Sequence, residues 1–139
     1  MINIIITSDP RYTVSRAAIE TAVINVLQEN KVNGRVEIEV SIVGDRKMHE
    51  LNKSYRGFDE TTNILTFALE DPNPQNLQHI PRVGFIASPD RVLRLGSIIL
   101  SYPQIVEDAG EYGNSIDEEI AFLVDHGTKH LLGIHHKPH

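Results

Sequence analysis

A group of histidines near the C-terminus places strong demands on how this chain folds. Five of its seven histidines lie within residues 125–139. His126 and His130 are four residues apart, so a helix would place their imidazoles one turn apart on the same side. Gly133 can end that helix, and the chain can then turn back and bring His136 toward the same point. Three neutral imidazoles around one open coordination position are typical of a catalytic zinc site.

The size and composition of the chain limit what else it can be. At 139 residues it is long enough for one domain with a real core, and 40% hydrophobic residues argue against wholesale disorder. Cysteine is absent, so a metal would have to be held by His, Asp or Glu. The N-terminal segment has no basic region and is too short to span a bilayer, and no targeting signal follows. We therefore expect a cytoplasmic protein with a single domain over residues 1–139 and no membrane partner.

The charge of the chain argues mildly against nucleic acid as a partner. The net charge is −6, and residues 95–139 hold seven acidic but only two basic side chains. Proteins that bind nucleic acid are usually basic overall. A local basic groove remains open, because four basic residues lie close together in the sequence, although composition alone favours a solvated helix face. These residues are Arg46, Lys47, Lys53 and Arg56, and Lys129, further along the chain, is also expected to contact RNA.

Hydrophobic periodicity predicts alternating strands and helices along the chain. The expected strands are residues 2–7, 35–43, 63–69, 83–87 and 95–100, and the expected helices are 13–29, 45–55, a short helix from Ser101, and one from Ser115. The strand 2–7 is mostly isoleucine and is predicted to be buried, and residues 70–82 are predicted to form an irregular loop. This order favours an α/β (α+β) fold in which helices cover a mixed, mainly parallel sheet of four to five strands.

The helix that carries the histidines has a clear start and a clear polarity. Ser115 and Glu118 form a capping box that would open it. Its apolar stripe consists of Ile116, Ile120, Leu123, Gly127 and Leu131. At about 100° per residue, His130 falls beside this stripe and His126 slightly further round, at the wall of a cleft. Gly127 within the stripe would let another backbone come close.

Two competing hypotheses fit the histidines less well. A histidine-rich terminus that binds metal loosely accounts for His135, His136 and His139, but not for the helical pair. A metallopeptidase would carry His-Glu-x-x-His, with the glutamate as general base, whereas Gly127 occupies that place here. Hydrolysis of a phosphodiester would still be possible. The metal would lower the pKa of its bound water to about 7, and a cation would stabilise the charge on the phosphoryl oxygens.

Three stretches of the sequence resemble one bacterial family. His126-Gly-x-x-His130-Leu-x-Gly133-x-x-His136 is similar to the signature His-Gly-x-Leu-His-Leu-x-Gly-Tyr-Asp-His of the YbeY family of rRNA maturation factors. A stretch that runs from Leu51 through Tyr55-Arg56 and Thr62 to Phe67 resembles that family's Leu-Asn-x-x-Tyr-Arg-x-x-Asp-x-x-Thr-Asp-Val-Leu-Ser-Phe. A third, Leu95-Gly-Ser-Ile98-Ile-Leu-Ser101, resembles Leu-Gly-Asp-Ile-x-Ile-Ser. The matches follow the family's order and spacing.

The resemblance implies a zinc-dependent endoribonuclease that acts on single-stranded RNA in rRNA maturation and ribosome quality control. It implies one Zn²⁺ per chain, with His126, His130 and His136 as ligands, and Arg56 as the essential catalytic arginine pointing into the cleft. A guanidinium can bind two phosphoryl oxygens at once, which fits that role. The implied partners are rRNA precursors and the small ribosomal subunit, with no small-molecule cofactor.

The chain departs from the family pattern in several places. Asn63 replaces an aspartate, which is a mild change. Ser97 replaces another aspartate and Ile134-His135 replaces Tyr-Asp, so two acidic groups are expected to be missing near the site. The sequence also stops three residues after His136, where relatives continue. We expect the metal site to survive these changes, and proton transfer or the walls of the RNA groove to be affected.

The sequence leaves the chemistry of the reaction partly open. The nucleophile would be zinc-bound water, and its proton acceptor would be His135, Asp125 or a second water; otherwise the RNA's own 2′-hydroxyl attacks, with zinc as Lewis acid. Two alternatives stand beside the endoribonuclease. One is another metal-dependent hydrolase, such as a peptidase, and the other is a non-catalytic ribosome-assembly factor with a structural metal.

Overall fold

The protein is built on a mixed four-stranded sheet. The computed structural model describes residues 1–69 and 92–134. The order across the sheet is β1 (Ile2–Ser8), β2 (Arg35–Val43), β4 (Val92–Ser101) and β3 (Ile64–Ala68). The pairs β1–β2 and β2–β4 are parallel, whereas β3 runs antiparallel to β4 at the edge. The predicted fold class, a mixed and mainly parallel sheet with helices, is confirmed.

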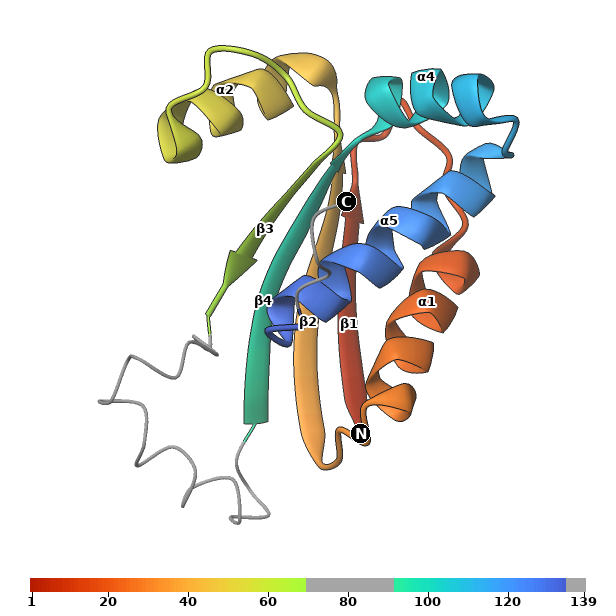
Figure 1. The fold of residues 1–139 in the computed structure, drawn as a ribbon, viewed down its shortest axis with the longest axis vertical. Helices are drawn as coiled ribbons and strands as arrows, with labels where there is room; N and C mark the ends of the chain where they lie inside the picture. Colours follow the sequence, from red (N-terminus) through yellow and green to blue (C-terminus); the bar gives the residue numbers. More distant parts are fainter. Residues whose placement is uncertain (70–91, 135–139) are drawn as a thin grey trace.

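Helices cover one face of this sheet and one of its ends. They are α1 (Arg16–Glu29), α2 (Asp45–Arg56), α4 (Tyr102–Tyr112) and α5 (Ile116–Leu131). Figure 1 shows α5 crossing in front of the strands with α1 beside it. Helices α2 and α4 directly follow β2 and β4, so both lie at the end of the sheet where these parallel strands finish (Figure 1). In the described part of the chain, no helix has the length and apolar character needed to cross a membrane.

The core lies between the sheet and the helix pair α1 and α5. On β2, Val36, Ile38, Val40 and Ile42 are all buried, as the alternation in the sequence predicts. The prediction that the whole first strand is buried is wrong in part. Ile6 is buried but Ile5 is 39% exposed, because β1 is an edge strand with only one covered face.

The element boundaries differ from the sequence predictions by a few residues. Helix α1 begins at Arg16 because Ser15 caps it, its side chain accepting a hydrogen bond from the Ala18 amide at 3.1 Å. Strand β4 already begins at Val92, and α4 is a full helix of 11 residues. The predicted strand 83–87 and the whole of the predicted loop 70–82 lie outside the described residues.

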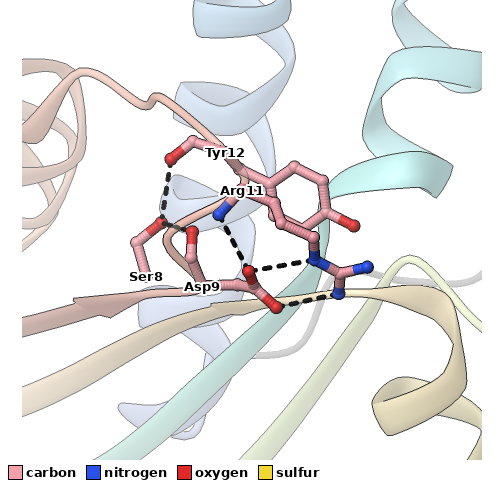
Figure 2. A network of polar contacts seen from close by, with 4 residues as sticks. All are labelled: Ser8, Asp9, Arg11 and Tyr12. Atoms are coloured by element: carbon pink, nitrogen blue, oxygen red, sulfur yellow. Dashed lines mark hydrogen bonds and ion pairs between the residues drawn. The ribbon is translucent and has the colours of Figure 1, made fainter.

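A compact polar turn connects β1 to the segment before α1 (Figure 2). Arg11 donates to Asp9 three times, through its backbone amide and through two guanidinium nitrogens at 3.1 and 2.8 Å. Tyr12 stacks on Tyr102 of α4, with ring centroids 4.5 Å apart. The turn therefore links the end of β1 to α4 at the end of the sheet where α2 begins.

Candidate functional site at the histidine helix

Helix α5 starts and stops where the sequence places its signals. Both hydrogen bonds of the capping box are present: Glu118 donates its amide to Ser115 Oγ at 3.0 Å, and Ser115 donates its amide to Glu118 Oε1 at 2.7 Å. At the other end, Gly133 adopts a left-handed φ of 84° and its amide bonds the His130 carbonyl at 3.0 Å. The two histidines therefore occupy the last two turns of the helix.

Gly127 sets how closely α5 approaches the sheet. It is buried, and a Cβ at this position would lie 3.1 Å from Ile98 Cδ1 and 3.2 Å from Ile64 Cδ1. The close neighbours are therefore side chains of β4 and β3, and not another backbone as expected from the sequence. This contact holds His126 and His130 beside the edge strand β3.

The structure brings three of the predicted site residues to one pocket. The pocket has a volume of about 490 Å³ and lies between the end of α2, the strand β3 and the end of α5. It is lined by Tyr55, Arg56, Ile64, Leu65, Thr66, Phe67, His126, Gly127 and His130. We call it the histidine pocket. Two imidazoles from one helix and a guanidinium from another thus share one solvent-accessible space.

The donor set of the histidine pocket suits a divalent metal, but only two of the three predicted ligands can be placed. Imidazole nitrogen is a common zinc ligand, and the two rings are one helical turn apart on α5. Within residues 1–69 and 92–134, no group of three His, Asp or Glu side chains is arranged to hold a metal ion. His136 and His135 lie outside the described residues, so both remain predictions.

Arg56 is positioned by the turn that ends α2. It is the last residue of the helix, and Gly57 follows with a left-handed φ of 77°. Asn52 is buried and donates to the Glu60 carbonyl at 2.8 Å, which ties the turn back to the helix. The Arg56 guanidinium lies over the Phe58 ring, 5.0 Å from its centroid. The exposed side chain is thus partly fixed at the rim of the pocket.

A second anchor holds the start of α2. Asp45 accepts hydrogen bonds from Ser101 Oγ at 2.7 Å, Thr61 Oγ1 at 3.2 Å and Gln104 Nε2 at 3.2 Å. These donors come from β4, from the α2–β3 connection and from α4. Helix α2 is therefore held by β4 and α4 at its start and by the following turn at its end, which stabilises the placement of Arg56.

Asp59 lies three residues after Arg56, and its carboxylate is engaged by other side chains. His49 Nε2 lies 2.6 Å from Asp59 Oδ1, and Lys53 Nζ lies 4.0 Å from the same oxygen. The hydrogen bond from His49, and secondly the charge of Lys53, hold the pKa of the Asp59 carboxyl below its ordinary value. The carboxylate thus stays charged without drawing on Arg56.

Two residues expected near the reaction face away from it. Asp125, a candidate proton acceptor, lines a separate groove between α1 and α5 and pairs with Lys129 at 2.9 Å. Lys129, expected to contact RNA, is therefore held in an ion pair on that side of the helix. The reason is rotation: successive residues on a helix lie about 100° apart, so Asp125 and His126 lie on different sides.

Ser97 is also further from the histidines than expected. Ile98 points at Gly127, so its neighbour on β4 points to the opposite face of the sheet. There Ser97 Oγ donates to Glu39 Oε1 at 3.1 Å. The loss of an aspartate at position 97 therefore changes the open face of the sheet and not the lining of the histidine pocket.

Several lining residues were missed by reasoning from the sequence. Tyr55 follows Met48 and Leu51 at the spacing of an apolar helix face, yet it is 68% exposed. Thr66 and Phe67 line the pocket because they belong to the edge strand β3, which borders it. The order of strands in the sheet is not visible in local periodicity. The signal in the sequence for Tyr55 and Phe67 was their place in the family-like stretch from Leu51 to Phe67, which gave them no role in a pocket.

The fold and the pocket together define a class of protein. Two helices packed on a mixed sheet place two imidazoles and a guanidinium around one open pocket. This arrangement suits metal-assisted chemistry on phosphate esters. Residues 5–139 match the family described as Endoribonuclease YbeY. The chain belongs to the YbeY family of endoribonucleases, enzymes that cleave phosphodiester bonds within RNA.

Individual relatives agree with this assignment. Endoribonuclease YbeY of Roseiflexus castenholzii is 39% identical over 130 residues, which cover 92% of this chain and 76% of that protein. Endoribonuclease YbeY of Dehalococcoides mccartyi is 36% identical over 135 residues, covering 97% and 80%. The solution structure of TM1509 from Thermotoga maritima matches with a TM-score of 0.56 and 25% identity, covering 96% of this chain and 75% of that one.

Proposed function

We propose that this protein is a zinc-dependent endoribonuclease that cleaves single-stranded RNA in the histidine pocket. The observation that carries the proposal is that His126, His130 and Arg56 line one pocket in a member of the YbeY family. We assign residues 1–139 to a single hydrolase domain. By analogy with the relatives' name, its substrates are RNA strands, and we propose rRNA precursors on the small ribosomal subunit, in the cytoplasm.

The metal in this proposal is one Zn²⁺ held by His126, His130 and His136. The two helical imidazoles support it, because their spacing and their common pocket suit a shared ion. A bound zinc ion would supply a Lewis acid that brings the pKa of a water molecule to about 7. With three protein ligands, a coordination position stays open for water or substrate, as in other catalytic zinc sites.

Arg56 binds and orients the phosphodiester in this proposal. Its guanidinium carries donors in a rigid fork that matches two phosphoryl oxygens, and it stabilises the negative charge that develops on them. The Phe58 ring beneath it limits the directions in which the side chain can point. A positioned cation costs less reorganisation in the transition state than a freely moving one.

The position of Asp125 argues against it as the proton acceptor. Asp125 lines the groove between α1 and α5 and is paired with Lys129, so we do not assign it this role. His135 and a second water molecule remain, as does attack by the RNA's own 2′-hydroxyl. A peptidase mechanism would need a glutamate at position 127, where a Cβ already meets Ile98 and Ile64 at 3.1–3.2 Å.

The experiment is a cleavage assay on purified protein with three substrates. We expect cleavage of a labelled single-stranded RNA, slower cleavage of the same sequence as a duplex, and no cleavage of a peptide. A chelator should abolish the activity, and added Zn²⁺ should restore it. Cleavage that persists after the chelator has removed all metal, or equal rates on duplex and single strand, would contradict the proposal.

A further inference from the structure

An exposed aromatic ring stands at the wall of the histidine pocket. Tyr55 belongs to the last turn of α2 and lines the pocket, yet 68% of the residue is exposed. An apolar ring in water loses the free energy that burial would provide, at about 25 cal/mol per Å². A tyrosine in this position therefore has surface available for a ligand that enters the pocket.

The ring of Tyr55 is held in place from one side. Phe67 of β3 contacts it edge to face, with centroids 5.1 Å apart and an interplanar angle of 67°. Phe67 also lines the pocket, so the pair belongs to two elements that meet there. A ring fixed in this way loses little conformational entropy when a flat ligand stacks on it.

The neighbouring residues place a phosphate-binding group next to this ring. Arg56 is adjacent in sequence, lines the same pocket, and lies over Phe58, which is 49% exposed. A flat aromatic surface and a guanidinium side by side match the two repeating parts of a nucleic-acid strand, the base and the phosphate. The histidines line the same space.

We propose that Tyr55, supported by Phe67, is a base-stacking subsite for a nucleotide next to the phosphodiester bound by Arg56. This inference rests on the proposed function and adds to it how the strand is held. Stacking accepts any base, because every base has a π-face, so the subsite gives affinity with little sequence preference. It also selects single strands, since paired bases are already stacked on one another and cannot reach the ring.

The test measures binding separately from cleavage. Short single strands of 2′-O-methyl, phosphorothioate nucleotides resist cleavage and can be titrated by fluorescence anisotropy. We expect Tyr55→Ala to weaken binding about 5- to 100-fold, the range for loss of one stacked base. Tyr55→Phe should bind like the wild type. Tyr55→Leu, which keeps apolar contact with Phe67, should bind as weakly as Tyr55→Ala.

A matched control is available elsewhere on the surface. Tyr112 is 66% exposed in the last turn of α4 and does not line the histidine pocket. Tyr112→Ala should therefore leave binding unchanged. In cleavage assays, Tyr55→Ala should raise KM with little change in kcat, because the ring binds substrate and transition state alike.

An abasic strand decides whether the ring contacts a base. Removing the stacked base should weaken binding by the wild type as much as Tyr55→Ala does. The same removal should not weaken binding by the Tyr55→Ala protein any further. Equal losses in both proteins, or wild-type affinity in Tyr55→Ala, would overturn the subsite. If the wild type binds these strands through Tyr55 yet cleaves no RNA, the proposed function fails and the stacking subsite stands.

Discussion

Arg56 is the last residue of α2, and the turn after it holds the guanidinium at the rim of the histidine pocket. We expect Arg56→Ala to reduce RNA cleavage by tenfold or more, about 1.4 kcal/mol of transition-state stabilisation. Arg56→Lys should restore little, because an ammonium does not replace a two-pronged donor. Single-turnover cleavage rates test this expectation.

Lys53 provides the control for this change. It lies on the same helix, is exposed and carries the same charge, but it does not line the pocket. Lys53→Ala should keep most of the activity. Melting temperature and zinc content should be unchanged in both variants, and an Arg56→Ala protein as active as Lys53→Ala would reject the assignment.

The contact between His49 and Asp59 should affect the titration of the Asp59 carboxyl. Because the folded pKa of Asp59 is lowered, the pair contributes stability above the ordinary aspartate pKa, and this contribution disappears as the pH falls through the folded pKa. NMR titration of the Asp59 carboxyl should give a midpoint below the ordinary value. His49→Ala should raise it more than Lys53→Ala does, since the His49 hydrogen bond is the largest cause. An unchanged midpoint in His49→Ala would contradict this cause.

In β4, a single glycine allows the neighbouring strand β3 to pair closely with it. Gly96 has a φ of 134°, and a Cβ there would collide with the Phe67 carbonyl oxygen of β3. Gly96→Ala should therefore lower the free energy of unfolding by at least about 2 kcal/mol, through backbone strain and overpacking. Denaturant unfolding would measure the loss.

Gly110 is the matched control for Gly96. It lies in α4, and a Cβ there would meet nothing within 4 Å. Gly110→Ala should be neutral or stabilising by up to about 1 kcal/mol, because alanine is the better helix former. If the two substitutions had equal effects on stability, the close approach of β3 to Gly96 would be in doubt.

The sequence predicted helix ends and strands well where they depend on residues close together in the chain. The capping box at Ser115 and the stop at Gly133 fixed the bounds of α5, and alternation predicted β2. Position in the sheet is a non-local property, so the exposure of Ile5 on an edge strand was missed. The same holds for Tyr55, because its exposure depends on how α2 meets β3.

The sequence predicted which residues line the candidate site better than it predicted which neighbouring residues face it. His126, His130 and Arg56 were identified by spacing and by resemblance, and they line one pocket. Asp125 and Ser97 were misjudged because nearness in sequence says nothing of which side of a helix or sheet a residue faces. Their contacts with Lys129 and Glu39 become apparent only in the folded chain.

On the scale of the whole molecule, the net charge of −6 limits how RNA can bind. Lys129 is paired to Asp125 and Lys53 lies 4.0 Å from Asp59, so among the described residues Arg56 is the cation that lines the histidine pocket. We expect about one phosphate contact, hence a slope of log K against log salt of about −0.7 for a single strand. Titrations at several salt concentrations measure it. A slope near zero would exclude phosphate contacts, and one much steeper would require a larger basic surface.

If three histidines hold one zinc ion in the histidine pocket, the metal content of the purified protein depends on each of them. Elemental analysis of purified protein, with zinc supplied and excess removed, should give about one zinc per chain. His126→Ala, His130→Ala and His136→Ala should each lose most of it. His49→Ala, which changes a histidine outside the pocket, should keep it. Wild-type protein without stoichiometric zinc, or full zinc content in all three variants, would contradict the account.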